Sequence, residues 1–228
     1  MVPIPDVAFD LELAHGRCLG VRLPEDAAGI DALAERLLPD ERAFAAGFGP
    51  ARRRTWIGGR VAMRLALERI GARAGAVLGD DRDAPLLPVG IAGSITHKQH
   101  VAAALVAREQ SARIGVDIEV DEPPRFDVSS RVLADDELAE LASWSEPQRV
   151  REVLLRFSAK EALYKALDPF VRRYVAFEEV SVTPRPDGTA SVHTRLPPTE
   201  GPFDVDVRWR RLDGLVLTTA RVKIVTAS

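Results

Sequence analysis

Two acidic residues stand two positions apart in the segment RIGVDIEV, residues 113–120. In a strand, Asp117 and Glu119 would point to one face, opposite to the aliphatic residues that alternate with them. Same-face neighbours lie roughly 6.5–7 Å apart at the backbone, so two flexible carboxylates could share one divalent cation. The simpler alternative is an amphipathic strand with two solvated acids.

The segment FSAKEALYKAL, residues 157–167, is typical of an amphipathic helix with charges at unusual positions. If Phe157 faces the core, Glu161 falls on nearly the same line and Lys165 lies less than a quarter turn away. These charges would then border the buried stripe and could face a site. The alternatives are a surface ion pair between Glu161 and Lys165, and a Lys160 side chain that extends to solvent.

Arginines gather in PARRRTWIGGRVAMRLAL, where residues 52–54 occupy the first turn of an expected helix. The helix dipole disfavours cations there, and a bound phosphate would resolve the conflict. Arg53, Arg60 and Arg64 share roughly one face of that helix. The alternative is a basic, solvated face. Arg82, in the turn DDRDAP, offers one more cation.

His97 ends the segment GSITH, at the point where a strand should give way to a turn. An imidazole there could bind a phosphate oxygen or carry a proton. The alternative is a solvated turn residue.

The pattern of the chain favours an α+β fold with antiparallel sheets, and no internal repeat is visible at the level of residues. The loop 121–127 is a candidate hinge between two halves. Helices are expected near 30–48, 50–70, 129–142 and 147–167, and Pro169 should help to stop the last one. Strands are expected at 18–23, within 93–107, at 113–120, and near 176–182, 190–195, 203–210 and 214–224.

Composition limits the kinds of partner and compartment. The 228 residues include 31 Lys+Arg and 34 Asp+Glu, a formal charge of -3, which argues against nucleic acid or an anionic membrane as partner. The one cysteine, Cys18, excludes an intrachain disulfide. The N-terminus does not resemble a secretory signal, and the apolar run 101–107 is too short to cross a bilayer. We therefore expect a cytoplasmic protein.

Taken in order, GSITH, GVDIEV and FSAKEALYKAL resemble the signature motifs of the 4'-phosphopantetheinyl transferases of the surfactin-synthetase type. RRRTWIGGRVAMRLAL and DRDAPLLPVG are similar to the bacterial subgroup that includes the enterobactin-synthetase transferases. The resemblance covers about residues 50–182. It implies two similar α/β subdomains with antiparallel sheets, packed pseudo-symmetrically, with boundaries at 1–112 and 113–228.

The resemblance also implies a set of site residues. Asp117, Glu119 and Glu161 would hold Mg²⁺ on the pyrophosphate of coenzyme A, which is the substrate. Catalytic roles would fall to Glu161, Lys165 and His97. The residues that would contact coenzyme A are Arg53, Arg60, Arg82, Ser94, His97, Lys160 and Lys165. Phe157 stands where the family commonly has Trp.

The implied reaction moves the 4'-phosphopantetheine arm of coenzyme A to a serine of an apo acyl or peptidyl carrier protein and releases 3',5'-ADP. Carrier proteins are typically acidic, so Arg172 and Arg173 are candidates to meet one. The enzyme is expected to be a monomer. Two alternatives stay open: an Mg²⁺-dependent coenzyme A or nucleotide pyrophosphohydrolase, and a noncatalytic coenzyme A-binding subunit.

Overall fold

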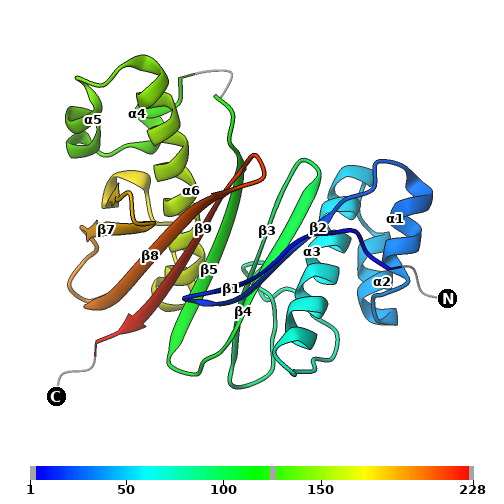
Figure 1. The fold of residues 1–228 in the computed structure, drawn as a ribbon. Helices are drawn as coiled ribbons and strands as arrows, with labels where there is room; N and C mark the ends of the chain where they lie inside the picture. Colours follow the sequence, from blue (N-terminus) through cyan, green and yellow to red (C-terminus); the bar gives the residue numbers. More distant parts are fainter. Residues whose placement is uncertain (1–3, 124–126, 226–228) are drawn as a thin grey trace. The chain divides into compact units, whose positions relative to one another are not determined.

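The computed structural model describes residues 4–123 and 127–225. The chain divides into two compact units, 1–110 (unit 1) and 111–228 (unit 2). Each unit has an antiparallel sheet and one long helix that packs on it (Figure 1). The α+β prediction with antiparallel sheets is therefore confirmed, whereas pseudo-symmetric packing of the two halves stays a prediction.

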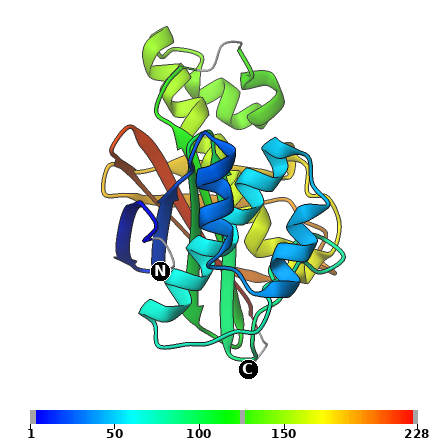
Figure 2. The same cartoon turned by 90° about the vertical axis from the view of Figure 1, so that its right-hand side faces the viewer.

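Unit 1 is built on a four-stranded sheet in the order β1-β2-β4-β3. Its long helix α3 packs on β2, β3 and β4, and the short helices α1 and α2 pack on α3 (Figure 2). The elements are β1 (Val7–Leu13), β2 (Gly16–Arg22), α1 (Ala27–Ala34), α2 (Pro39–Ala46), α3 (Pro50–Arg69), β3 (Ile91–Lys98) and β4 (Val101–Arg108).

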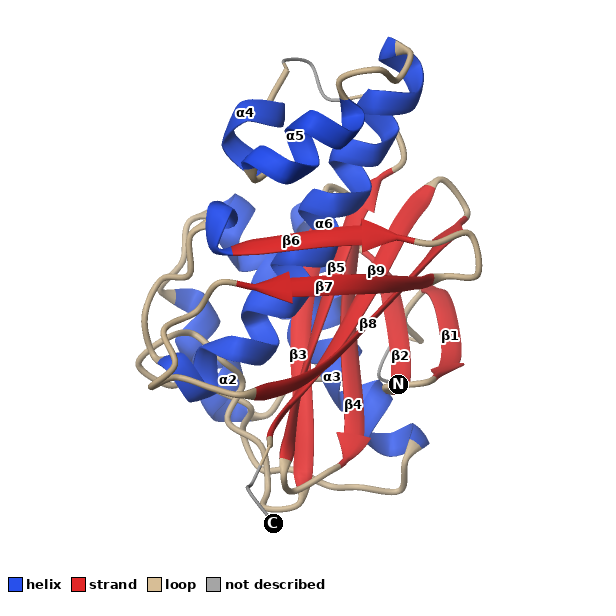
Figure 3. Cartoon of the chain, turned by 90° about the vertical axis from the view of Figure 1, so that its left-hand side faces the viewer, coloured by secondary structure: helices blue, strands red, loops and turns tan. Residues whose placement is uncertain are grey.

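Unit 2 is built on a five-stranded sheet in the order β5-β9-β8-β7-β6, with α6 packed on β5 and β9 (Figure 3). Its strands are β5 (Ala112–Val120), β6 (Val180–Pro184), β7 (Thr189–Thr194), β8 (Phe203–Leu212) and β9 (Leu215–Ile224). Its helices are α4 (Ser129–Val132), α5 (Asp135–Leu141), α6 (Glu146–Val171) and the 3₁₀ turn η1 (Phe177–Glu179).

Glycines let the long helices approach their sheets closely. A Cβ on Gly115 of β5 would lie 1.8 Å from the carbonyl oxygen of Ala162, so the backbones of β5 and α6 meet with no side chain between them. In unit 1 the glycine is on the helix instead, where a Cβ on Gly58 would lie 2.0 Å from Cδ2 of Leu23. The contact in unit 2 is therefore the less adaptable one, since the obstacle is backbone.

Unit 1 contains an arrangement that we call the glutamate clamp. Glu41 of α2 is fully buried, and its Oε2 accepts the Leu38 N–H at 2.8 Å, which caps its own helix. The same oxygen accepts Nε–H of Arg64 on α3 at 2.8 Å. Oε1 accepts the Val77 N–H at 2.8 Å. One carboxylate thus joins the short helix, the long helix and a loop.

Unit 2 contains the same clamp. Glu137 of α5 is 1% exposed and accepts the Ala134 N–H and the Val182 N–H, each at 2.8 Å. Its cation is Lys160 of α6, at 2.5 Å. Glutamate and cation are 23 residues apart in both units. The clamp is a repeat that sequence comparison within the chain does not reveal, because the cation and the capped residue differ between the units and the shared glutamate and valine stand far apart in sequence.

Several expected boundaries are wrong. The helix expected over 30–48 is two helices, because Pro39 starts a new one. The helix expected over 129–142 is likewise split into α4 and α5. Pro169 does not stop α6, which continues to Val171 and ends on Arg172 in the left-handed conformation, φ 49°. Strand β1 is an addition, and residues 124–126 of the expected hinge lie outside the described residues.

Candidate active site

The two acids of β5 lie on one face of a strand that is buried on both sides. Asp117 is 6% exposed and Glu119 is 7% exposed. In the register of the sheet, Asp117 stands opposite Thr218 of β9 and Glu119 stands opposite Val216. The alternative of two solvated acids is therefore wrong for this strand, and burial of two carboxylates requires compensating partners.

Lys165 of α6 provides one such partner. Its ammonium donates to Oδ1 of Asp117 at 2.9 Å and to the carbonyl oxygen of Val116 at 2.8 Å. It thus reaches across to β5 instead of remaining a surface charge. The close contact at Gly115 makes this reach possible, since it brings the axis of α6 near the strand.

Glu161 lies one helical turn before Lys165, with its side chain partly buried. Burial raises the pKa of its carboxyl above the ordinary value, and the negative charges of Asp117 and Glu119 raise it further. The Lys165 ammonium acts in the opposite direction and lowers this pKa. The charges of Asp117 and Glu119 thus act on the Glu161 carboxyl, and that the three acids share one metal ion stays a prediction.

A cluster of three carboxylates with one lysine is chemically suited to a hard divalent cation, which would relieve the repulsion between them. In the part of the chain that the structure describes, however, no three Asp, Glu, His or Cys side chains already form a metal site. Asp117 in particular bonds to Lys165 and to the hydroxyl of Ser158. The donor types fit Mg²⁺, and binding would require these side chains to adjust.

Lys160 is placed differently from the expectation that it contacts coenzyme A. It is fully buried, and its ammonium donates to the carbonyl oxygens of Val132 (2.8 Å) and Phe177 (2.9 Å) and to Glu137. All three ammonium protons are thereby used inside unit 2. Burial lowers the pKa of Lys160 below its ordinary value. The structure corrects this prediction: Lys160 is the cation of the clamp.

The arginines at the start of α3 are neutralised within unit 1. Arg53 donates to Asp31 of α1 at 2.7 Å, and Arg54 donates to the Pro24 carbonyl at 2.7 Å. Arg52 lies 3.6 Å from Asp83 and above the ring of Phe48. Acids and carbonyls from other elements thus offset the unfavourable helix dipole without a phosphate. Arg53, half-buried and paired with an exposed carboxylate, could still exchange that partner for an anion.

Arg60 lies deeper in unit 1 and is 7% exposed. Its guanidinium stacks on the ring of Trp56, 4.4 Å from the centroid, and donates to the Val77 carbonyl at 3.0 Å. Burial lowers the pKa of Arg60 to about 10, which still leaves it charged at neutral pH. This side chain offers a fixed positive charge, although most of it is enclosed.

The other expected contacts to coenzyme A also lie in unit 1. Ser94 is buried on β3, and His97 is exposed near the end of the same strand. Arg82 is exposed in a turn in which Asp80 accepts the backbone N–H of residues 82 and 84 at 2.8 and 3.0 Å. That these three residues act together with the acids of unit 2 stays a prediction.

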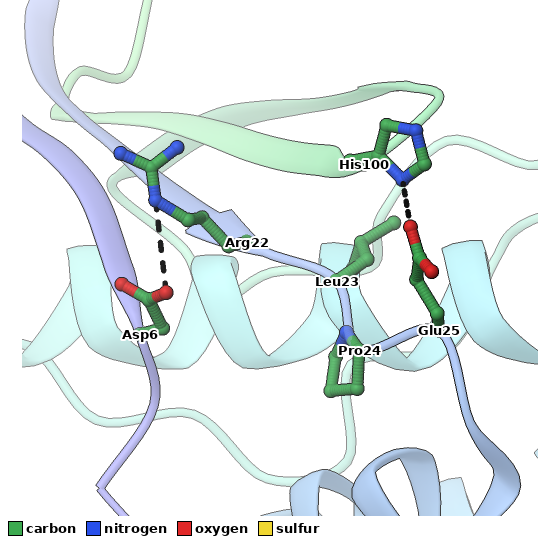
Figure 4. Close-up of a pocket in the computed structure, with 6 residues that line it drawn as sticks. All are labelled: Asp6, Arg22, Leu23, Pro24, Glu25 and His100. Atoms are coloured by element: carbon green, nitrogen blue, oxygen red, sulfur yellow. Dashed lines mark ion pairs between the residues drawn. The ribbon is translucent and has the colours of Figure 1, made fainter.

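A surface hollow of about 350 Å³ in unit 1 is lined in part by His100 (Figure 4). Its polar residues pair with one another: Arg22 lies 3.6 Å from Asp6, and the His100 ring lies 3.5 Å from a carboxylate oxygen of Glu25. The remaining lining residues are Leu23 and Pro24. Since its lining holds two carboxylates and one arginine, this hollow is poorly suited to a polyphosphate.

Arg173, a candidate for the carrier protein, is committed to unit 2. Its guanidinium donates to both carboxylate oxygens of Glu179, at 2.9 and 2.6 Å, and to both of Glu200, at 2.7 and 2.9 Å. Hydrogen bonds from the two carboxylates raise the pKa of Arg173 above the ordinary value. The structure thus favours a structural role for Arg173 and leaves Arg172, which is exposed, as the candidate.

The motifs alone do not single out three buried polar residues of unit 2: Ser158 and Thr218, which lie beside Asp117, and Glu137, which bonds to Lys160. For Ser158 a signal exists, because it precedes Glu161 by three positions and Lys165 by seven and so shares their helix face. For Glu137 the signal is a helix start with Glu at the third position. Thr218 is distant in sequence, and only the pairing of β5 with β9 places it beside Asp117.

Two protein families match the chain. Residues 113–220 match the family described as 4'-phosphopantetheinyl transferase superfamily, and residues 40–107 match the 4'-phosphopantetheinyl transferase N-terminal domain.

None of the helices in residues 4–123 and 127–225 combines the length and apolar character that a bilayer span requires.

Curated relatives share about a third of their residues with the chain. The 4'-phosphopantetheinyl transferase Svp of Streptomyces mobaraensis is 35% identical over 193 residues, covering 82% of this chain and 78% of the relative. The 4'-phosphopantetheinyl transferase Npt of Nocardia iowensis is 33% identical, covering 73% and 81%. Among solved structures, a holo-ACP-synthase from Plasmodium yoelii has a TM-score of 0.41 and 17% identity, covering 51% of this chain and 100% of that one.

Proposed function

Because the chain belongs to the 4'-phosphopantetheinyl transferase superfamily, we propose that it transfers the 4'-phosphopantetheine arm of coenzyme A to a serine of an apo carrier protein, releasing 3',5'-ADP. The observation that carries this proposal is the cluster in which α6 sets Glu161 and Lys165 against the buried Asp117 and Glu119. It combines a candidate base, a cation and three anionic oxygen donors, which suits attack on a phosphorus rich in negative charge.

In this proposal Glu161 takes the proton from the serine hydroxyl of the carrier. Burial and the neighbouring acids raise the pKa of Glu161, which favours its role as a proton acceptor over that of an ordinary glutamate. Lys165 would offset negative charge on the transferred phosphate and on the leaving group. His97 would contribute to the same charge stabilisation from unit 1.

Asp117, Glu119 and Glu161 would hold Mg²⁺. The cation would supply charge neutralisation at the pyrophosphate, which is its usual contribution in phosphoryl transfer. Lys165 would then give up part of its present contact with Asp117 and turn its ammonium to a phosphate oxygen. Mg²⁺ dependence is a part of the proposal that can fail on its own.

For coenzyme A itself we propose contacts from unit 1. Arg53, Arg60 and Arg82 would face its phosphates, with Ser94 and His97 lining the same site. Arg53 would exchange Asp31 for a phosphate oxygen, a stronger partner for a guanidinium. We assign no coenzyme A contact to Lys160.

The carrier would meet unit 2 near the end of α6, where Arg172 and the 74% exposed Tyr174 flank Arg173. Reversal of the charge at Arg172 should raise the KM for an acidic carrier and leave the KM for coenzyme A unchanged. Reversal at Arg173 should instead destabilise unit 2, since it would break the contacts to Glu179 and Glu200. A cytoplasmic, monomeric enzyme without nucleic-acid or membrane partners stays our prediction.

Intact-mass analysis of a generic apo carrier protein, incubated with coenzyme A and with or without Mg²⁺, tests the proposal. We expect the mass to increase by one phosphopantetheine arm only when the metal is present. Hydrolysis of coenzyme A without a carrier would favour the pyrophosphohydrolase alternative. Binding of coenzyme A with neither reaction would favour the noncatalytic subunit.

The variant Glu161→Gln tests the base. It should lower turnover by about 10²- to 10⁴-fold, the usual contribution of a general base, and keep the fold and much of the coenzyme A binding. Glu178→Gln is the matched control, because Glu178 is an exposed glutamate of the same unit. Unchanged turnover in Glu161→Gln would remove Glu161 from the mechanism.

A further inference from the structure

Behind Asp117 lies a pair of hydroxyls that the reaction does not use. Ser158 of α6 and Thr218 of β9 are both fully buried. The Ser158 hydroxyl lies 2.9 Å from Oδ2 of Asp117 and 2.9 Å from Oγ1 of Thr218. Oγ1 of Thr218 also lies 2.8 Å from the Ser158 carbonyl oxygen. Three elements of unit 2 thus meet at one carboxylate.

Each hydroxyl has one proton, and this fixes the direction of the hydrogen bond between Ser158 and Asp117. An ionised carboxylate can only accept, so the single proton of the Ser158 hydroxyl must go to Asp117. The single proton of Thr218 is then shared between the carbonyl oxygen and the hydroxyl oxygen of Ser158. Thr218 can therefore act on Asp117 only through Ser158, by fixing the direction of its hydroxyl.

The carboxylate of Asp117 is held at both oxygens by one helix. Ser158 donates to Oδ2, and Lys165, two turns further along α6, donates to Oδ1. Glu161 lies between these two residues on the same helix. The two contacts therefore set both the orientation of Asp117 and the register of Glu161 against β5.

Packing alone does not require a hydroxyl at position 158. The clamp aligns Arg64 of α3 with Lys160 of α6, and the residue two positions before each cation is Ala62 in unit 1 and Ser158 in unit 2. Both residues are fully buried. A small side chain thus suffices at this position of the scaffold, and the oxygen is found only in the unit that carries the acids.

We propose that Ser158 is a positioning residue, which orients the Asp117 carboxylate for the bound metal and phosphate, and that Thr218 acts through it. This inference rests on the proposed function. Partners of metal-binding carboxylates typically change metal affinity by 10- to 100-fold when they are removed. Loss of the Ser158 hydroxyl should therefore have a larger effect on the affinity for the metal than on the free energy of unfolding.

The test compares Ser158→Ala, Thr218→Val and the double variant with the wild-type chain. The first readout is Mn²⁺ binding to the protein without coenzyme A, followed by electron paramagnetic resonance. The second is the Mg²⁺ concentration that gives half-maximal transfer. We expect both to worsen by 10- to 100-fold in Ser158→Ala and by less in Thr218→Val. The double variant should equal Ser158→Ala, because Thr218 acts through Ser158.

Two controls separate positioning from stability. Ser181→Ala removes another hydroxyl of unit 2 that donates to a carboxylate, Asp136, at 2.7 Å, and should change neither readout. Thr218→Ser keeps the hydroxyl and should restore metal binding. If Ser158→Ala proves unstable, the comparison of Thr218→Val with Thr218→Ser decides the matter, since these variants differ in the hydroxyl.

Wild-type metal affinity and wild-type Mg²⁺ dependence in Ser158→Ala would overturn the inference while the proposed function stands. If the wild-type chain transfers nothing to a carrier, the proposed function fails. The Mn²⁺ comparison would then still decide, by itself, whether Ser158 orients Asp117. Absence of Mn²⁺ binding by the wild-type chain would also overturn the inference.

Discussion

Units 1 and 2 use the same clamp, but only unit 2 adds acids beside it. In both, a buried glutamate caps a short helix and bonds to a cation 23 residues later on the long helix. One position after that cation, unit 1 has Leu65 and unit 2 has Glu161. Two positions before it, unit 1 has Ala62 and unit 2 has Ser158.

This difference separates scaffold from chemistry within a single motif. FSAKEALYK contains two lysines that the sequence presents as equivalent, yet Lys160 corresponds to the clamp cation Arg64 and Lys165 contacts Asp117. Residues that both units share hold the fold together. Those that only unit 2 has at these positions are, beside His97 of unit 1, the candidates for catalysis, and the predictions below test that division.

The largest effect should come from Lys160→Met. Glu137 would lose its nearest cation while it remains buried, and two carbonyl oxygens would lose a donor. Removal of one partner from a buried ion pair typically costs about 3–5 kcal/mol. Denaturant unfolding should show this loss, with the KM for coenzyme A unchanged at temperatures where the variant is folded. A raised KM for coenzyme A with an unchanged free energy of unfolding would show instead that Lys160 contacts coenzyme A.

Arg64→Met is the matched variant in unit 1. The Arg64 side chain is 17% exposed, so water can replace part of its contact with Glu41. We expect a smaller loss, about 1–3 kcal/mol, in the same unfolding measurement.

Gly115→Ala should cost about 3 kcal/mol and also lower turnover, because its Cβ would push the backbone of α6 away from β5. Gly58→Ala is the comparison in unit 1, where the obstacle is the end of the flexible Leu23 side chain. Alanine also favours a helix over glycine by about 1 kcal/mol, so the net loss there should be about 1 kcal/mol or less. Equal losses in the two variants would show that the helix contacts of the two units are equally adaptable.

Arg53→Ala should raise the KM for coenzyme A about tenfold and leave kcat nearly unchanged, since it removes a binding contact that is equal in ground and transition states. Arg69→Ala, at the other end of α3, is the control; Arg69 pairs with Asp10 and should not affect either constant. Steady-state kinetics with a fixed carrier protein measures both variants. A fall in kcat alone for Arg53→Ala would contradict a simple binding role.

The smallest effect concerns Cys18, which reports on unit 1 alone because it is the only cysteine of the chain. It is fully buried, and burial raises the pKa of its thiol to about 12. At pH 8 the folded protein should therefore react with an aromatic disulfide reagent far more slowly than the unfolded chain does. Arg64→Met should speed this reaction. Rapid labelling of the wild-type chain would show that unit 1 opens readily.

Regular patterns made much of the fold predictable. The 20-residue helix α3 and the strands β3 to β5 follow the expected apolar spacing closely. The starts of α2 and α5 are harder to predict, because buried capping glutamates set them and apolar spacing does not. Strand β1 was missed, although Val7–Leu13 alternates apolar residues in part, since an edge strand buries few of them.

The candidate site could be predicted as far as its charges follow local spacing. Asp117 and Glu119 are two apart on a strand, and Glu161 and Lys165 are four apart on a helix, so each pair is visible in a short window. The partners of these residues are not local. Whether a lysine meets a phosphate or a buried Glu137 depends on contacts between elements far apart in sequence, which no motif records.

The contact at Gly115 has a consequence for how the site can adapt. With bare backbone against bare backbone, β5 and α6 form one stiff block, and neither element can slide along the other without lifting off it. Under the proposed function, substrates that differ in bulk would then be accommodated by the tips of the long side chains and by the surrounding loops. A broader range of coenzyme A substrates should accordingly be sought by changing those loops, with the contact between β5 and α6 left as it is.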